Sequence, residues 1–404
     1  MNDTIVSAEV LVSSPSRNYV TLRITTADGI VGLGDGTLNG RELAVASYLK
    51  DHLCPLLIGQ DPSRIEDIWQ YFYRGTYWRR GGVMMAAIGA IDIALWDILG
   101  KRAGLPVYQL LGGRVRDKVP AYGHAFGWEV PELLEAVDRE LERGANYIRV
   151  QSGVPGHSKV YGVSKDPNYE PASRGARPSE ESFEPELYIR HLPKVLEAVR
   201  EKVGPSVHIL HDAHHRLTPN QAVRLAKAVE EFGLFWLEDV TPVEDQEALR
   251  MVRQASSTPL AIGEVFTSIW DCKYLIENRL IDYIRTAPNH AGGISHQRKI
   301  YALAEINGVK AGPHGPSDIS PISLAASIHL GTAVHNWGVA EYMGFSEKTH
   351  EAFPHAWHYE DGGLQPGDAP GLGVELNEEV LNSEPYEPAY LPTARRFDGS
   401  VLDW

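Results

Sequence analysis

The chain has 404 residues, of which 43% are hydrophobic and 23% are charged. These values are typical of globular proteins and exclude a largely disordered chain, and the length allows a second domain. The formal net charge of −15 disfavours partners that are themselves anionic, namely nucleic acids and acidic membrane surfaces.

The cysteine content and the absence of visible targeting signals indicate the cellular compartment. Cys54 and Cys272 are the only cysteines, too few for a disulfide framework or a zinc site. The first residues lack a basic segment followed by an apolar run, and no stretch reaches the roughly 18 apolar residues that a membrane span needs. We therefore expect a cytoplasmic protein that does not contact membranes.

Residues 1–115 predict an α+β domain. Within residues 4–36, two runs have strand-like alternation, and Asp28-Gly29 between two such runs predicts a hairpin. Helical patterns then cover residues 42–59, 62–75 and 84–104, and Gly104 is placed to cap the last of them. Strands followed by helices are typical of an α+β domain.

After Lys118 the pattern changes to alternating strands and helices. The strand candidates are residues 119–124, 147–151, 207–212, 235–239, 260–264, 282–286, 309–314 and 339–342. Eight strands alternating with helices predict a (β/α)₈ barrel, which we place at residues 116–375. A modified barrel with one or two irregular units would look much the same from sequence, and Gly- and Pro-rich sequence weakens the eighth helix. The tail, residues 376–404, has too little apolar material to fold alone and is expected to return to the first domain and the barrel mouth.

Three successive strand candidates end in a carboxylate. Asp212, Glu238 and Glu264 are each 26 residues apart. Parallel barrel strands deliver their carboxyl ends to one face, so the three acids are expected to converge. Converging carboxylates need a cation, and oxygen ligands suit Mg²⁺, with Mn²⁺ as the alternative. Any one acid could instead cap a helix or face solvent, but the regular spacing favours a metal site.

Other strand ends carry titratable groups, and one interval is unusually long. The groups are His124, Arg149, His214, Arg285, His314 with Asp318, and Glu341. A lone histidine is usually structural, but His214 follows Asp212 by two residues and, in an extended strand end, would share its face. More than 30 residues separate the second strand from the helix near Glu186. A loop of that length at a barrel mouth is a natural carrier of a catalytic side chain.

Several motifs together resemble the enolase superfamily. They are the run AAIGAIDIALWDILGKRAGLPVYQLLGG, the three strand-end acids, and His314 after the seventh strand. The runs NYIRVQSG, KVYG, HDAHHRL and HGPSDISP and the terminal DW more closely resemble its mannonate dehydratase group, which includes proteins named for starvation sensing. The resemblance covers essentially the whole chain and implies a capping domain over a modified barrel.

The resemblance also implies a mechanism. Asp212, Glu238 and Glu264 would bind Mg²⁺, and a proton would leave the carbon next to the carboxylate of an acid sugar. Many superfamily members carry a lysine base on the second strand, where this chain has Arg149. In the resembled group a loop tyrosine, matched here by Tyr161, takes the proton beside that arginine. His214 would protonate the departing 3-hydroxyl.

The implied substrate contacts include two departures from the superfamily pattern. The contacts are Asn39, His124, Glu264, Arg285, His314, Asp318 and Glu341, with Trp78 and Trp404 near the pocket. The sixth strand ends in TAPNH and lacks the aspartate that often partners the seventh-strand histidine, so His314 is expected to bind substrate or polarise it. Pro316 stands where efficient mannonate dehydratases have alanine, which implies weak activity on mannonate or gluconate.

Together these features predict a Mg²⁺-dependent dehydratase that converts D-mannonate, D-gluconate or both to 2-keto-3-deoxy-D-gluconate. A racemase or epimerase that stops before elimination is one alternative. A weakly active or inactive relative that binds or senses a sugar acid is another. No DNA-binding helix or basic stripe is visible, and a homo-oligomer, in which the loop bearing Trp78 completes a neighbour's pocket, is the default assembly.

Overall fold

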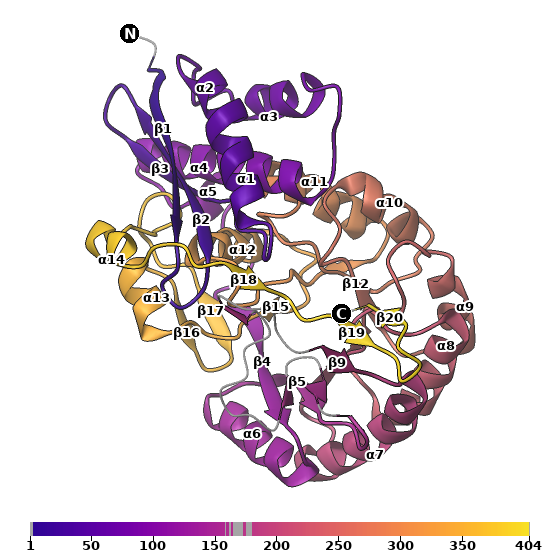
Figure 1. Ribbon diagram of the computed structural model, residues 1–404. Coiled ribbons are helices and arrows are strands. Elements are labelled where there is room, and N and C mark those ends of the chain that lie inside the picture. The colour runs from indigo at the N-terminus through magenta and orange to yellow at the C-terminus, as the bar shows by residue number, and fades with distance from the viewer. Residues whose placement is uncertain (1–2, 158, 161–162, 165–172, 175–179, 404) are drawn as a thin grey trace.

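The computed structural model describes residues 3–157, 159–160, 163–164, 173–174 and 180–403, which form a barrel with a cap (Figure 1). The cap contains an antiparallel sheet of β1 (Ile5–Ser13), β2 (Tyr19–Thr26) and β3 (Val31–Asp35). The predicted hairpin at Asp28-Gly29 joins β2 to β3, with Gly29 at φ 85°. The helical segments are α1 (Glu42–Tyr48), a π-helical turn (Leu49–Leu53), α2 (Cys54–Leu57), α3 (Ile65–Arg74), α4 (Gly82–Ala103) and α5 (Val107–Leu110).

The long helix α4 is the core of the cap. Gly32 and Gly34 of β3 allow close contact between strand and helix, because a Cβ at Gly32 would lie 2.3 Å from a carbonyl oxygen of α4. The helix ends at Gly104 in the left-handed conformation, as predicted. By length and composition α4 could cross a membrane, but 78% of its most apolar window is buried, which is typical of a core helix.

The barrel strands follow one another in parallel order. They are β4 (Val119–Gly127), β5 (Tyr147–Ser152), β10 (His208–Asp212), β11 (Trp236–Glu238), β12 (Leu260–Ile262), β13 (Tyr283–Ile284), β14 (Lys310–Ala311) and β15 (Ala340–Glu341). β15 pairs with β4 and so brings the last strand back to the first. The outer helices are α6 (Val130–Glu142), α7 (Pro185–Val203), α8 (Pro219–Ala228), α9 (Ala248–Ala255), α10 (Ile269–Glu277), α11 (Gly293–Ile306) and α12 (Pro321–Ala333). The predicted capped barrel is confirmed.

Aromatic side chains fill the barrel interior. Tyr122, Trp236 and Tyr283 pack there with the smaller apolar residues Leu210, Ala261 and Val339. The interior is therefore a packed core, and a site can form only at an end of the barrel. Several strands are shorter than predicted, so Glu264, Arg285 and His314 lie just beyond the ends of β12, β13 and β14.

The eighth repeat is irregular, as the Gly- and Pro-rich sequence predicted. After β15 the chain forms only the short α13 (Glu347–Ala352) in place of a full outer helix. It then makes the hairpin of β16 (His358–Glu360) and β17 (Gly363–Gln365), and β17 pairs antiparallel with the start of β4. A last helix, α14 (Glu378–Ser383), precedes the tail.

The tail crosses from the cap to the barrel mouth (Figure 1). The backbone N–H of Ser14 in the cap donates to the carbonyl of Glu384. Farther along, β18 (Ala389–Tyr390) and β19 (Ala394–Arg395) pair with β8 (Ser173–Arg174) and β9 (Glu181–Ser182) of the long interval. The other short strands are β6 (Lys159–Val160), β7 (Val163–Ser164) and β20 (Val401–Leu402). The tail thus contacts both the cap and the long interval.

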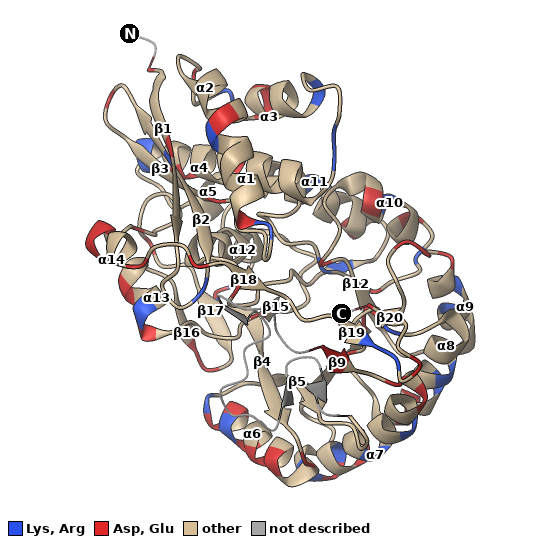
Figure 2. Ribbon diagram, viewed as in Figure 1, with Lys and Arg blue, Asp and Glu red and all other residues tan. Residues whose placement is uncertain are grey.

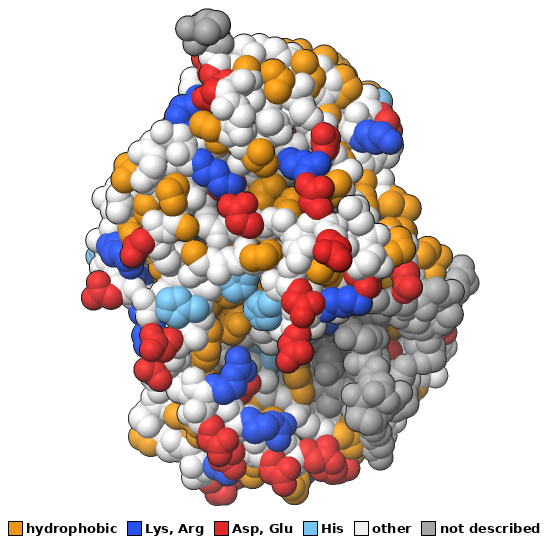
Figure 3. Space-filling model, turned by 90° about the vertical axis from the view of Figure 1, so that its left-hand side faces the viewer, with side chains coloured by type: hydrophobic (Ala, Val, Ile, Leu, Met, Phe, Trp, Pro, Cys, Tyr) orange, Lys and Arg blue, Asp and Glu red, His pale blue; other side chains and the backbone are white. Residues whose placement is uncertain are grey.

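The outer surface carries charges of both signs. Acidic and basic residues intermingle on the outer barrel helices (Figure 2) and on the face shown in Figure 3. Some pair across helices, such as Arg224 on α8, which donates two hydrogen bonds to Glu186 on α7. Such pairs are exposed to solvent and contribute little to stability.

Candidate active site

A cavity of about 380 Å³ lies between the cap and the carboxyl ends of the barrel strands. The barrel contributes His214, His215, Glu264, His290, His314, Pro316 and Asp318 to its lining, and the cap contributes Arg17, Leu38 and Asn39. Five of the residues singled out from sequence, Asn39, His214, Glu264, His314 and Asp318, therefore meet at one cavity, together with Pro316.

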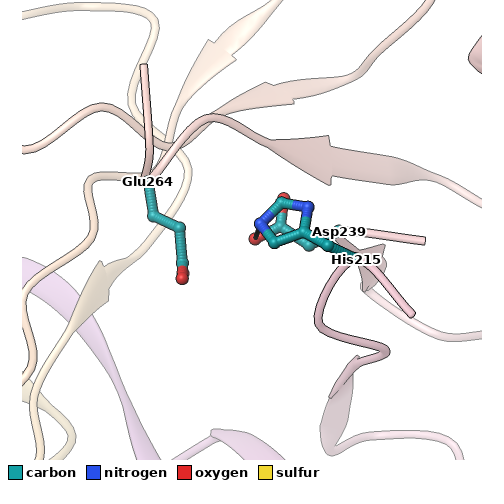
Figure 4. Close-up of side chains that lie close together, drawn as sticks. All are labelled: His215, Asp239 and Glu264. Atoms are coloured by element: carbon teal, nitrogen blue, oxygen red, sulfur yellow. Dashed lines mark ion pairs between the residues drawn. The ribbon is translucent and has the colours of Figure 1, made fainter. Parts of the chain in front are cut away.

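The acids at the strand ends form two compact sets that share one residue. Asp212, Glu238 and Asp239 can place ligand atoms within 4.8 Å of one another, and so can His215, Asp239 and Glu264. In Figure 4, His215 and Asp239 approach from one side and Glu264 from the other. The three predicted carboxylates are divided between these sets, with Asp212 and Glu238 in one and Glu264 in the other, and Asp239 belongs to both.

The turns after β10 and β11 have unusual backbone geometry. His214, His215 and Asp239 have φ of 57°, 62° and 46°, the left-handed region that is unfavourable for residues other than glycine. The backbone N–H of His214 donates to Oδ1 of Asp212 and holds the first turn. The expectation of an extended strand end at His214 is therefore wrong. The turn still places both histidines at the cavity, with Nε2 of His214 3.6 Å from Oε1 of Glu264.

Two buried arginines compensate part of the negative charge. Nη2 of Arg285 lies 2.8 Å from Glu341, and its Nε contacts Glu238. Nη2 of Arg149 lies 3.2 Å from Oδ2 of Asp212, and Nη1 lies 3.8 Å from Glu341. These arginines link acids from strands on both sides of the mouth.

The acids differ in how well this charge is compensated. Burial alone would raise the pKa of Glu341, but Arg285 and His124 hold it well below its usual value. Burial also opposes ionisation of Asp212, yet Arg149 and the neighbouring histidines keep its pKa low. At Glu264, burial and the charge of Asp212 raise the pKa to about 7. The cluster therefore holds more carboxylates than its arginines can neutralise.

Glu238 and Asp239 are the most strongly affected carboxylates. Burial, reinforced by neighbouring acids, raises the pKa of both groups well above the usual range. Oδ1 of Asp239 receives no hydrogen bond from any residue in the described part of the chain. Buried carboxylate oxygens short of positive charge are the donor set that a hard divalent cation prefers.

Burial keeps the rings of His124, His214 and His314 predominantly neutral. Burial lowers the pKa of His124 and His314 below the usual value and lowers that of His214 to about 3. Nε2 of His124 lies 3.1 Å from Glu341, and Nε2 of His314 lies 3.5 Å from Glu264. Each ring is thus within reach of an acid of the cluster.

Hydrogen bonds join the cap side of the cavity to the loop that follows β14. Nδ2 of Asn39 donates to Oδ2 of Asp318 at 2.8 Å, and the hydroxyl of Tyr19 donates to the carbonyl of Ser317. Pro316 lies in the same loop, where its carbonyl accepts from the N–H of Ile319. The cap therefore holds the loop that follows β14 through both its sheet and its Asn39 loop.

Several residues singled out from sequence are not part of this cavity lining. Six of them are largely buried residues at the barrel mouth that do not line the cavity, namely His124, Arg149, Asp212, Glu238, Arg285 and Glu341. Trp78 is 84% exposed beside the equally exposed Tyr77, and neither belongs to the cavity lining. Tyr161 and Trp404 lie outside the described residues.

Some residues of the cavity lining and of the acidic cluster were missed from sequence. His215 and Asp239 stand in the runs HDAHH and LEDV, directly after predicted site residues, and His290 ends the run TAPNH. A search extended a few residues past each strand end would have included them. Arg17 gave no such signal, because it lies in a cap loop far away in sequence.

Known proteins resemble this chain over its full length. The description "Mandelate racemase / muconate lactonizing enzyme, N-terminal domain" matches residues 8–112, and "Enolase C-terminal domain-like" matches residues 157–380. A D-galactonate dehydratase family member from Streptomyces bingchenggensis is 62% identical over 403 residues, which cover 100% of this chain and 98% of that protein. The chain belongs to the enolase superfamily.

Further relatives place this enolase-superfamily protein among acid-sugar dehydratases. A D-mannonate dehydratase from Caulobacter sp. strain K31 is 52% identical over 401 residues, covering 99% of each chain. The crystal structure of an enolase from Pantoea ananatis with bound D-gluconate and Mg superimposes with a TM-score of 0.92 at 39% identity and covers 100% of both chains. The predicted superfamily is thus confirmed, and the relatives' names indicate a dehydratase.

Proposed function

We propose that this enolase-superfamily protein is a cytoplasmic Mg²⁺-dependent dehydratase that converts D-mannonate, D-gluconate or both to 2-keto-3-deoxy-D-gluconate and water. The main support is that Glu264, His214 and His314 line one cavity, and that further buried acids and two buried arginines lie at the same barrel mouth, in a chain similar to named dehydratases. Removal of a weakly acidic proton beside a carboxylate needs this combination of positive charge and proton-transfer groups.

The donor atoms fit a divalent cation. Asp212, Glu238 and Glu264 would hold Mg²⁺, with Mn²⁺ as the alternative, and Asp239 adds carboxylate oxygens to the same cluster. A bound cation would compensate the negative charge that develops on the substrate carboxylate as the adjacent proton leaves.

Arg149 and Tyr161 would remove that proton. Arg149 is buried next to Asp212 in the middle of β5, and an arginine keeps its own proton too tightly to be a base. Tyr161 follows β6 in sequence and is proposed as the base. Its phenol has an ordinary pKa of about 10, so a nearby guanidinium is needed to favour the phenolate.

His214 would protonate the departing 3-hydroxyl. Its ring lies at the cavity beside Glu264, and burial keeps it neutral in the absence of substrate. An anionic substrate next to the ring would raise its pKa and favour the imidazolium form that can donate. This group favours elimination over the racemase or epimerase alternative.

The remaining residues would bind the sugar chain. Asn39, His314 and Asp318 line the cavity and offer neutral and acidic hydrogen-bonding groups, with His124, Arg285 and Glu341 packed behind them. Trp404 is proposed near the same pocket. Trp78 lies away from its own cavity, so it would contribute only in a homo-oligomer, by completing a neighbouring subunit's pocket.

A substrate screen tests the function. Purified protein with Mg²⁺ is incubated with a panel of aldonic and aldaric acids, and 2-keto-3-deoxy product is measured. Strong turnover of mannonate alone would support the reaction and show that Pro316 does not impair it. Weak turnover of both mannonate and gluconate would support the chemistry with another physiological substrate.

The screen also separates the alternatives. Solvent deuterium incorporated at the carbon next to the carboxylate without loss of water, seen by NMR in D₂O, would favour a racemase or epimerase. Tight binding with negligible turnover would favour a sensing role. Product from none of the acids would refute the dehydratase assignment.

A further inference from the structure

His290 is a lining residue that the mechanism above does not use. It lies in the loop between β13 and α11 and contributes to the same cavity wall as His314 and Asn39. The centroids of the His290 and His314 rings are 6.3 Å apart, so the two rings are neighbours without a direct hydrogen bond. His290 is not adjacent to the acidic cluster in sequence.

A carbonyl of the cap fixes the tautomer of His290. Nε2 lies 3.0 Å from the carbonyl oxygen of Thr37, and the same oxygen accepts from Nδ2 of Asn289 at 2.9 Å. A carbonyl oxygen can only accept hydrogen bonds, and it has two lone pairs for two donors. Nε2 of His290 must therefore carry the hydrogen.

The other ring nitrogen is then an acceptor. Burial and the proximity of His314 lower the pKa of His290, which keeps the ring neutral. In a neutral imidazole with hydrogen on Nε2, Nδ1 has a free lone pair. None of the described residues donates a hydrogen bond to this atom, and the ring borders the cavity.

Thr37 holds this arrangement rigidly. Its N–H donates to Asp35 and its hydroxyl oxygen accepts from the N–H of Val20, so its carbonyl cannot turn away from the barrel. Asp35 also accepts from the N–H of Ser320, beyond the loop that carries Pro316. The ring of His290 is therefore oriented by the cap before any ligand binds, which lowers the cost of binding.

We propose that Nδ1 of His290 accepts a hydrogen bond from the 4-, 5- or 6-hydroxyl of the bound acid sugar, away from the two reacting carbons, and selects for that hydroxyl. The proposal rests on the proposed function, since it names a contact in the same cavity. A site built to accept from a hydroxyl rejects an analogue that lacks it, because the acceptor is left without a partner.

The test uses binding constants, measured by isothermal titration calorimetry on the full chain with Mg²⁺. The ligands are D-gluconate and its 4-deoxy, 5-deoxy and 6-deoxy analogues. His290→Phe keeps a ring but removes both nitrogens, and His290→Gln supplies a donor for Thr37 and an amide oxygen as acceptor. Asn289→Ala is the matched control, because it removes a donor to the same carbonyl from a buried residue outside the cavity lining.

We expect His290→Phe to weaken gluconate binding by about tenfold and His290→Gln to restore part of the loss. For one deoxy analogue, wild type and His290→Phe should bind equally. An equal loss on all four ligands, or the same ligand pattern in Asn289→Ala, would overturn the proposal and leave His290 as an anchor for the cap. If His290→Phe does not fold, His290→Leu is read in the same way. A wild type that neither binds nor converts any sugar acid would refute the proposed function itself.

Discussion

The barrel side and the cap side of the cavity differ in kind. On the barrel side, Asp212, Glu238, Arg149 and Arg285 are almost completely buried, and the arginines form ion pairs with the acids and compensate part of their charge. On the cap side, contacts such as that of Asn39 with Asp318 are single hydrogen bonds of partly buried groups. Removal of a weakly acidic proton is favoured by strong electric fields in a low dielectric. Selection among sugars depends instead on individual hydrogen bonds to their hydroxyl groups. The difference suggests that mutations on the two sides will fail in different ways.

Loss of a strand-end carboxylate should have the largest effect, because it impairs turnover and Mg²⁺ binding together. Glu238→Gln is nearly isosteric but removes a negative charge from the cation site, and kcat should fall on the order of 10³-fold as several kcal/mol of charge stabilisation is lost. Mg²⁺ affinity, measured by calorimetry, should fall in parallel. Asp239→Asn sharpens the test, because an equal loss of Mg²⁺ affinity would add Asp239 to the ligands. Glu186→Gln, on the outer surface, is the control.

Replacement of the proposed base should separate chemistry from metal binding. Tyr161→Phe removes the phenolic hydroxyl, and kcat should fall about 10²- to 10⁴-fold, the usual range for a general base. Mg²⁺ affinity should not change, since the phenol is not a proposed ligand. A fully active Phe variant would remove Tyr161 from the mechanism and leave the acidic cluster as it stands.

The charge balance of the barrel side should be visible in stability. Arg285→Met leaves Glu238 and Glu341 without their buried partner and should lower the free energy of unfolding by about 3–5 kcal/mol. Urea denaturation without Mg²⁺ measures this change. Arg224→Ala removes an arginine that makes two hydrogen bonds to one carboxylate at the surface and should change stability far less. Equal effects would mean that burial is not what distinguishes the barrel side.

A cap-side contact should have the smallest effect. Asn39→Ala removes one hydrogen bond to Asp318, and kcat/KM should fall about tenfold or less, mainly through KM. Steady-state kinetics with D-mannonate and D-gluconate measures it. Asn336→Ala, which removes amide hydrogen bonds to two carbonyls outside the cavity, should alter stability without altering KM. A fall in kcat of Asn39→Ala as large as that of Glu238→Gln would erase the contrast between the two sides.

Much of the fold could be predicted from sequence because local patterns specify it. Alternating strands and helices indicated the barrel, and all eight predicted strands are present, although several are shorter. The hairpin at Asp28-Gly29 and the cap at Gly104 followed from the backbone freedom of glycine. The residues at which the strands end were less predictable, because a strand ends where its backbone stops pairing with the neighbouring strands, and that depends on the tertiary structure.

The candidate site was predictable where chemistry coincides with a strand end. Asp212 and Glu238 fall on the last residues of β10 and β11, and the regular spacing of such ends in sequence indicated a common face. His215 and Asp239 were missed because their own backbone is in the left-handed conformation, which their residue types do not predict.

The sequence by itself determined the capped barrel and the strand-end acids, since periodicity and spacing are local properties of the chain. Only the tertiary structure decided which loop residues share the cavity. Thr37 and His290 are 253 residues apart in sequence, and their hydrogen bond forms only because the cap packs on the barrel mouth. The tautomer of His290, and with it the proposed selection of a hydroxyl, depends on that long-range contact, and no local pattern encodes it.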